Sequence, residues 1–148
     1  MIWTPHVTVA AIIAHEERFL LVEEDDNGRR VLNQPAGHLE PDESLLDAVV
    51  RETLEETGWR FAPHAIIGIY RWTNPVDDVT YVRFCFAGEH SDFDPDHELD
   101  PDIVRTVWKS RAEIAAAHSA LRSPLVLRSI DDYLAGRRYS TDLLGDAL

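Results

Sequence analysis

Three glutamates spaced for one face of a helix are the residues of this sequence best suited to chemistry. Glu52, Glu55 and Glu56 stand at positions i, i+3 and i+4, so a helix would bring their carboxylates together. Like charges so placed repel one another, and a bound cation reverses that effect. Hard divalent cations such as Mg²⁺ prefer carboxylate oxygens and keep several waters, which suits a substrate that contributes phosphate oxygens. The same pattern also fits a plain solvated helix face, and the surrounding sequence decides between the two.

The segment that would position these glutamates reads as a loop, a helix and a glycine stop between Gly37 and Trp59. Asp42 follows Pro41 and offers an N-cap oxygen, and Gly58 stands where a helix ends in the left-handed conformation. Helical spacing predicts that one face packs on a core and that the glutamates project from the opposite side. The predicted core face consists of Leu46, Val50, Thr53, Leu54 and Thr57.

This segment resembles the Nudix box, the signature of the Nudix hydrolase family. The pattern is G, x5, E, x7, R, E, U, x, E, E, x, G, U, where U is bulky and apolar, and here it runs from Gly37 through Glu43 to the stretch Arg51–Trp59. Every required Gly, Glu and Arg is in place, and Thr53 alone departs, on the predicted buried face. The resemblance implies an α/β fold, specifically an α/β/α sandwich around a mixed sheet. It also implies hydrolysis of a nucleoside diphosphate linked to another group.

The resemblance assigns roles to the acidic face. Glu52, Glu55 and Glu56 would be the metal ligands, helped by a backbone carbonyl near Ala36 or Gly37. We expect the glutamates to titrate as a coupled set, so no single one is named as the base. Mg²⁺ is the expected cofactor, with Mn²⁺ able to substitute.

Two further box residues and one loop residue are expected to support these ligands. Arg51 would be structural, pairing with a neighbouring carboxylate such as Glu55, and Glu43 would orient the loop or hold the ligands from outside. Family members often supply a fourth carboxylate six residues before a strand tryptophan. Counting back from Trp108 gives Asp102 as the preferred extra ligand or base, and Glu98 is the second candidate.

The candidate phosphate contacts are three arginines and a histidine. Arg71 and Arg83 interrupt otherwise apolar strands, where an unpaired charge is costly, so each either faces water at an edge or points into a pocket. Arg29 is either solvent-facing or a substrate contact. His38 lies inside the box and is either a phosphate contact or an exposed loop histidine.

Composition bounds the remaining choices. The 148 residues suit a single domain, and the formal net charge of −13 argues against coating a nucleic acid polymer, although a small phosphorylated ligand can still bind. There is no apolar run long enough to cross a membrane and no basic signal peptide. Cys85 is the only cysteine and lies in an apolar strand pattern, so we expect a buried thiol and a cytoplasmic protein.

The remaining segments predict a mixed sheet between helices. Strands are expected over 6–15, 18–23, 59–62, 66–72, 79–87 and 103–108, and helices from Ser110 to about His118 and from Pro124 to Leu134. A hairpin turn is predicted at residues 25–28 and a long acidic loop at 90–102. Residues 137–148 are expected to form a loosely ordered tail of the same domain, 1–148.

Motifs outside the box resemble a phosphatase branch of the Nudix family. They are HVTVA, NQPAGHLE, LRSPLV and SIDDYLAGRRY, with Leu32 where a tryptophan is usual. This resemblance implies release of orthophosphate from nucleoside tri- and diphosphates and from the pyrophosphorylated pyrimidine precursor of thiamine. Trp3 or Trp72 could stack on a flat ring, although both also fit a core position.

Two other functions stay open. A generic pyrophosphohydrolase, converting a nucleoside triphosphate or an ADP-sugar to a monophosphate, uses the same box. A non-catalytic nucleotide sensor is the binding alternative, and it need not keep all three glutamates. In each case the partner is a small phosphorylated molecule, and the protein is a monomer or a homodimer.

Overall fold

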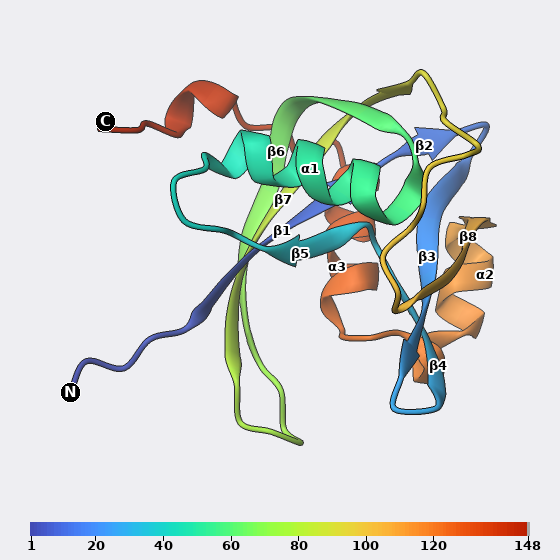
Figure 1. Ribbon diagram of the computed structural model, residues 1–148, viewed down its shortest axis with the longest axis horizontal. Coiled ribbons are helices and arrows are strands. Elements are labelled where there is room, and N and C mark those ends of the chain that lie inside the picture. Colours follow the sequence, from blue (N-terminus) through green and yellow to red (C-terminus); the bar gives the residue numbers. More distant parts are fainter. Residues whose placement is uncertain (148) are drawn as a thin grey trace.

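The computed structural model describes residues 1–147, and a mixed four-stranded sheet lies at its centre (Figure 1). Its strand order is β5 (Ala36–His38), β1 (His6–Ile12), β7 (Thr80–Ser91) and β6 (Arg60–Thr73). β1 runs parallel to β7, whereas β5 and β6 pair antiparallel with their neighbours. As predicted for a strand covered on both faces, β1 is almost fully buried from Val9 to its end.

A second sheet is antiparallel and stands beside the first. It contains β2 (Ala14–His15), β3 (Arg18–Asp26), β4 (Arg29–Asn33) and β8 (Ile103–Ser110), with β8 paired to β3. The predicted turn joins β3 to β4, and positive φ angles of 53° at Asn27 and 86° at Gly28 suit a tight hairpin. The predicted strand over 6–15 is therefore divided, because its last two residues turn into the second sheet.

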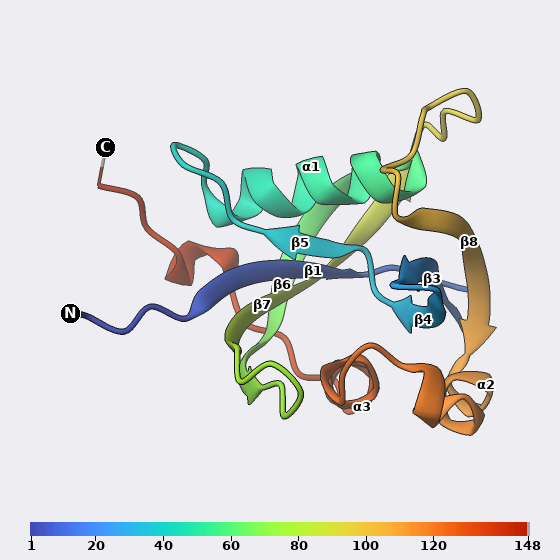
Figure 2. The same ribbon diagram turned by 60° about the horizontal axis from the view of Figure 1, so that its bottom comes forward.

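Helices cover both sides of the sheets, which confirms the predicted mixed α/β architecture (Figure 2). α1 (Leu45–Thr57) lies on one side, and α2 (Arg111–Ala116) and α3 (Leu125–Leu134) lie on the other. Short 3-10 segments, η1 (His118–Ala120) and η2 (Thr141–Leu143), complete the described elements. Ser110 caps α2 through a reciprocal capping box with Glu113. None of the described helices is long and apolar enough to span a membrane.

Each face of the central sheet has its own apolar core. On the α1 side, Ala48 and Val49 pack with Val9 and Phe86. On the α3 side, side chains of α3 pack with Ala10, Ile12 and Cys85. The Cys85 thiol is buried, as predicted, and burial raises its pKa to about 12.

The start and the orientation of α1 differ from the prediction. Ser44, not Asp42, is the N-cap, and its hydroxyl accepts a hydrogen bond from the Asp47 amide at 3.0 Å. Glu52 and Glu56 do not project away from the core, because they share the buried stripe with Val49 and Thr53, whereas Glu55 is partly exposed. Of the predicted core face, Thr53 and Thr57 are buried as expected, whereas Leu46, Val50 and Leu54 are only partly buried. The buried face of α1 is therefore apolar near the start of the helix and carries glutamates and threonines in its last two turns.

Long-range pairing extends two other elements. The strands predicted at 59–62 and 66–72 form one strand, β6, with register shifts at Pro63/Ala65 and Ile66/Gly68, so the two apolar runs are joined through bulges. β7 continues to Ser91, which shortens the predicted acidic loop. In the predicted tail, Tyr139 exchanges two backbone hydrogen bonds with Ile66, both at 2.8 Å. Residue 148 lies outside the described residues.

Candidate functional site

Three carboxylates converge at the end of α1. Glu52, Glu55 and Asp100 each offer an oxygen, and these atoms lie within 4.8 Å of one another. The Asp100 amide donates to the Glu55 backbone carbonyl at 3.1 Å, which holds the 92–102 loop against the helix. An oxygen-only set with this spacing fits a hard divalent cation such as Mg²⁺.

Gly37 forms the other side of this cluster. A Cβ added at Gly37 would collide with the Glu52 carboxylate, so only glycine allows the β5 backbone to approach that carboxylate so closely. The backbone around Gly37 therefore borders the cluster, and its help in metal binding stays a prediction.

Asp102 does not join the cluster, and Asp100 takes the place expected for it. The Asp102 carbonyl accepts a hydrogen bond from the Asp25 amide at 2.9 Å, and Asp102 lines a small hollow beside the β3–β4 turn. The pairing of β8 with β3 has a register shift between Glu23 and Glu24. The hydrogen bond from Asp25 holds the end of the 92–102 loop beside β3, away from the carboxylate cluster. Glu98, the second candidate, is also absent from the cluster in the described residues.

Glu56 is set apart from the cluster and deeply buried. Its carboxylate accepts a hydrogen bond from the Ala36 amide at 2.9 Å. Burial raises the pKa of Glu56 to about 9, and the nearby Glu24 and Glu52 carboxylates add to the shift. Burial likewise raises the pKa of Glu52 to about 7, against the lowering effect of the Arg51 guanidinium. Both carboxyls therefore bind a proton at higher pH than a free glutamate does.

Arg51 holds the acidic groups in place. It donates to Glu43 at 2.6 and 2.9 Å, to Glu52 at 2.8 Å and to Glu55 at 3.2 Å. It also donates to the His38 carbonyl at 3.0 Å, which ties the loop of the box to the helix. The hydrogen bond from Arg51 lowers the pKa of Glu43. Arg51 therefore links Glu43 to two carboxylates of the helix and to the loop of the box, and the supporting roles of both residues stay predictions.

The raised pKa values predict that metal-free protein loses stability as the pH rises from about 5 to 9. A carboxyl with a folded pKa near 9 and an unfolded pKa near 4.5 keeps a proton in the folded state throughout that interval. Raising the pH therefore favours unfolding. Thermal unfolding in EDTA should show a falling Tm, and Glu56→Gln should flatten the slope, whereas Glu89→Gln, at an exposed site, should not. An unchanged slope in Glu56→Gln would contradict the assignment.

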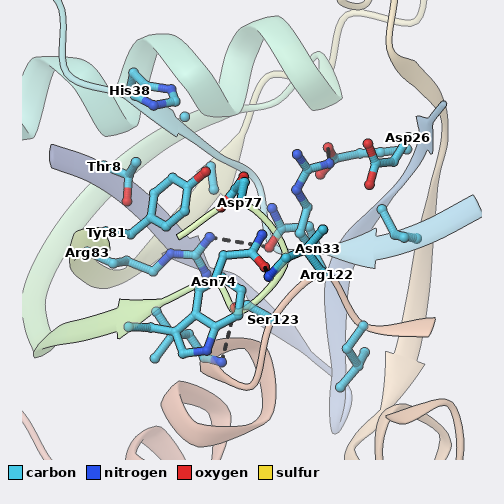
Figure 3. A pocket seen from close by; sticks show the side chains of 18 of the residues that line it. Thr8, Asp26, Asn33, His38, Asn74, Asp77, Tyr81, Arg83, Arg122 and Ser123 are labelled. Carbon is cyan, nitrogen blue, oxygen red and sulfur yellow. Dashed lines mark hydrogen bonds and ion pairs between the residues drawn. The ribbon is translucent and has the colours of Figure 1, made fainter. Parts of the chain in front are cut away.

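A cleft of about 620 Å³ opens on the opposite side of β5 (Figure 3). Gly37 lines it, so the cleft and the carboxylate cluster share this strand. Arg29, Arg83 and His38 line the cleft as well, and their side chains come from three different strands. Arg71 does not line it. Its side chain is exposed on β6, opposite Val82, on the other face of the sheet from Arg83.

The aromatic wall of the cleft is Trp72, stacked on Tyr81 with ring centroids 6.0 Å apart and an interplanar angle of 20°. Trp3 is exposed and does not line the cleft. His38 forms a 2.9 Å hydrogen bond with His6, and partial burial, together with His6, lowers the pKa of His38.

The sequence analysis missed Arg122, Ser123 and Thr8 as cleft residues. Arg122 and Ser123 belong to the LRSPLV motif, and Thr8 belongs to the HVTVA motif. Leu121 pairs with Leu32, and this contact brings the LRSPLV motif to the cleft. No local pattern signals that pairing, because the two residues are far apart in the sequence.

Comparison with known proteins gives one consistent result. The NUDIX domain model matches residues 4–128. Phosphatase NudJ of Escherichia coli strain K12 is 46% identical over 142 residues, covering 96% of this chain and 92% of that protein, and the Shigella flexneri phosphatase NudJ matches equally. Among solved structures, a NUDIX hydrolase from Nitrosomonas europaea superposes with a TM-score of 0.95 at 51% identity, covering 97% of both chains.

Proposed function

Because the chain belongs to the Nudix family and is an enzyme that hydrolyses phosphoanhydride bonds, we propose that it is a Mg²⁺-dependent phosphatase of nucleoside tri- and diphosphates. Its product would be orthophosphate. The single observation that carries this proposal is the carboxylate cluster of Glu52, Glu55 and Asp100, which shares Gly37 with a cleft lined by arginines. The cluster also favours catalysis over nucleotide sensing, since a pure sensor has no need of it.

Some residues of the site would bind the cation, and others hold the cation-binding carboxylates in position. A divalent cation would polarise the phosphoryl oxygens and help to deprotonate the attacking water. Glu52, Glu55 and Asp100 would hold the cation, while Arg51 keeps two of these carboxylates oriented through its hydrogen bonds. Hydrolysis of a phosphoanhydride depends mostly on such positioning and on stabilising charge on phosphoryl oxygens.

The cleft supports a substrate with a flat ring joined to a phosphate chain. Trp72 offers a ring face, and Arg83 offers a buried cation on the neighbouring strand. A pyrophosphorylated pyrimidine, such as the thiamine precursor, meets this description, as does a nucleotide. The identity with proteins named as phosphatases supports release of orthophosphate over release of pyrophosphate.

The generic alternative is a pyrophosphohydrolase that forms a monophosphate directly. The carboxylate cluster serves either reaction, so product analysis has to separate them. We predict that a nucleoside triphosphate gives the diphosphate and orthophosphate first, followed by slower conversion to the monophosphate. Malachite-green detection, with and without added pyrophosphatase, together with chromatography of the nucleotides, measures this order. Monophosphate and pyrophosphate appearing together at the earliest time point would reject the phosphatase assignment.

A further inference from the structure

The three arginines that line the cleft differ in how far their charge is already satisfied. Arg122 forms an ion pair with Glu24 at 3.0 Å, and Arg29 is exposed and donates to the Ser119 carbonyl at 2.7 Å. Arg83 is only 8% exposed, and within residues 1–147 it forms no ion pair with a carboxylate. A buried guanidinium without an anionic partner is costly to the fold.

The hydrogen-bond partners of Arg83 are neutral, and the Glu24 and Glu56 carboxylates act on it only from beyond ion-pair distance. Its guanidinium donates to the Gln34 side-chain oxygen at 3.1 Å and to the Asn33 side-chain oxygen at 3.4 Å. A guanidinium carries five N–H groups, so these two bonds leave donors for a ligand. Figure 3 shows the Arg83 side chain reaching across the floor of the cleft toward Asn33.

Thr8 supplies an independent sign of a missing ligand. Its hydroxyl is buried, and it is the one buried side-chain polar atom in the described residues that has no hydrogen-bond partner. Thr8 lines the same cleft and is the register partner of Arg83 on the parallel strand β1. Paired residues on adjacent strands direct their side chains to the same face of the sheet, so Thr8 and Arg83 both face the cleft. A buried polar group of this kind calls for a partner that the chain itself does not provide.

We propose that Arg83 and Thr8 form a phosphate subsite, which holds the phosphate that stays with the nucleoside and so selects which phosphorus is attacked. This inference rests on the proposed orthophosphate-releasing function. Gly37 separates the carboxylate cluster from the cleft, so the subsite and the cluster lie on opposite sides of β5. A phosphate anchored in the cleft would leave the terminal phosphate free to extend past Gly37 to the cluster.

The reaction then follows from this placement. The oxygen of water forms a bond to the terminal phosphorus, and the bond between that phosphorus and the bridging oxygen breaks, so that the bridging oxygen stays with the anchored phosphate. The electron pair of that bond stays on the diphosphate, and the water proton passes to solvent. The products are orthophosphate and a nucleoside diphosphate whose last phosphate remains on Arg83.

Inorganic phosphate binding to EDTA-treated protein tests the subsite without any turnover. Arg83→Met should weaken phosphate binding at least tenfold in isothermal titration at fixed ionic strength. Arg71→Met is the matched control, because Arg71 is an exposed arginine on the adjacent strand outside the cleft, and it should bind phosphate as the wild type does. Normal phosphate affinity in a folded Arg83→Met variant would overturn the proposal.

Thr8→Val keeps the test decisive if Arg83→Met does not fold. This change removes the unpartnered hydroxyl and nearly preserves the side-chain volume, so Tm should stay the same or rise. Phosphate affinity should nevertheless fall at least threefold. A merely structural role for Thr8 would leave phosphate affinity unchanged, and that result would also overturn the proposal.

The products of ATP hydrolysis with Mg²⁺ test the selection of the phosphorus. In Arg83→Met, the initial ratio of orthophosphate to pyrophosphate should fall at least tenfold, whereas a structural role would slow both products equally. A slower variant with the wild-type ratio contradicts the proposal. If the wild-type enzyme itself releases pyrophosphate first, the proposed function fails, and the phosphate-binding result still decides separately whether the subsite exists.

Discussion

Removing divalent metal with excess EDTA is expected to reduce phosphate release to the uncatalysed background, and excess Mg²⁺ or Mn²⁺ is expected to restore it. Glu52, Glu55 and Asp100 each bring a carboxyl oxygen within 4.8 Å of the others, and a cation stabilises the charged form of this cluster. Without the cation, these carboxylates would also repel the phosphate chain of the substrate. The whole rate enhancement that depends on polarising the phosphoryl oxygens should therefore disappear.

The control for this experiment is the fold itself. Circular dichroism of the chelated protein should match that of the metal-loaded protein, because the apolar cores on both faces of the central sheet contain no metal ligand. EDTA saturated beforehand with Mg²⁺ should leave activity intact. Full phosphate release by completely chelated, folded protein would contradict the assignment of a divalent metal to the carboxylate cluster.

The fold could be predicted from the sequence where local chemistry determines it. The spacing of the box indicated a helix ending at Gly58, and Gly58 does adopt a left-handed φ of 76°. Hairpin chemistry at Asn27 and Gly28 gave the β3–β4 turn, and Ser110 gave the start of α2. In each case a few neighbouring residues carry both the signal and the structure.

The orientation of α1 could not be settled in this way. Val49, Glu52, Thr53 and Glu56 form one helical stripe, and its acidic members make it look like a solvent-facing surface. In the fold, the Ala36 amide and Arg51 satisfy these carboxylates, so the stripe can be buried. The satisfying groups come partly from β5, which helical periodicity does not report.

Strand register decided which arginine faces the cleft. Arg71 and Arg83 looked alike in the sequence, because each interrupts an apolar strand. The pairing of β6 with β7 places Tyr70 opposite Arg83 and Arg71 opposite Val82, so the two arginines lie on opposite faces of the sheet. Register depends on bulges in β6 that no local motif indicated.

Asp100→Asn is expected to lower kcat by roughly 100-fold or more, the scale of one lost electrostatic stabiliser, whereas Asp102→Asn should have a much smaller effect. The Asp100 carboxylate lies with Glu52 and Glu55, and its replacement by an amide removes a charged ligand at nearly constant volume. Asp102 lies two residues away but outside the cluster, so it is a closely matched control.

Glu55→Gln should match the effect of Asp100→Asn, because both residues contribute to the same cluster. Neither change should unfold the protein, since the backbone hydrogen bond from Asp100 to Glu55 is retained and one like charge is removed. Steady-state kinetics at saturating Mg²⁺, with Tm measured for each variant, gives the comparison. A large loss in Asp102→Asn with near-normal kcat in Asp100→Asn would mean that the loop moves by two residues on binding metal, and that the six-residue count back from Trp108 identifies the true ligand.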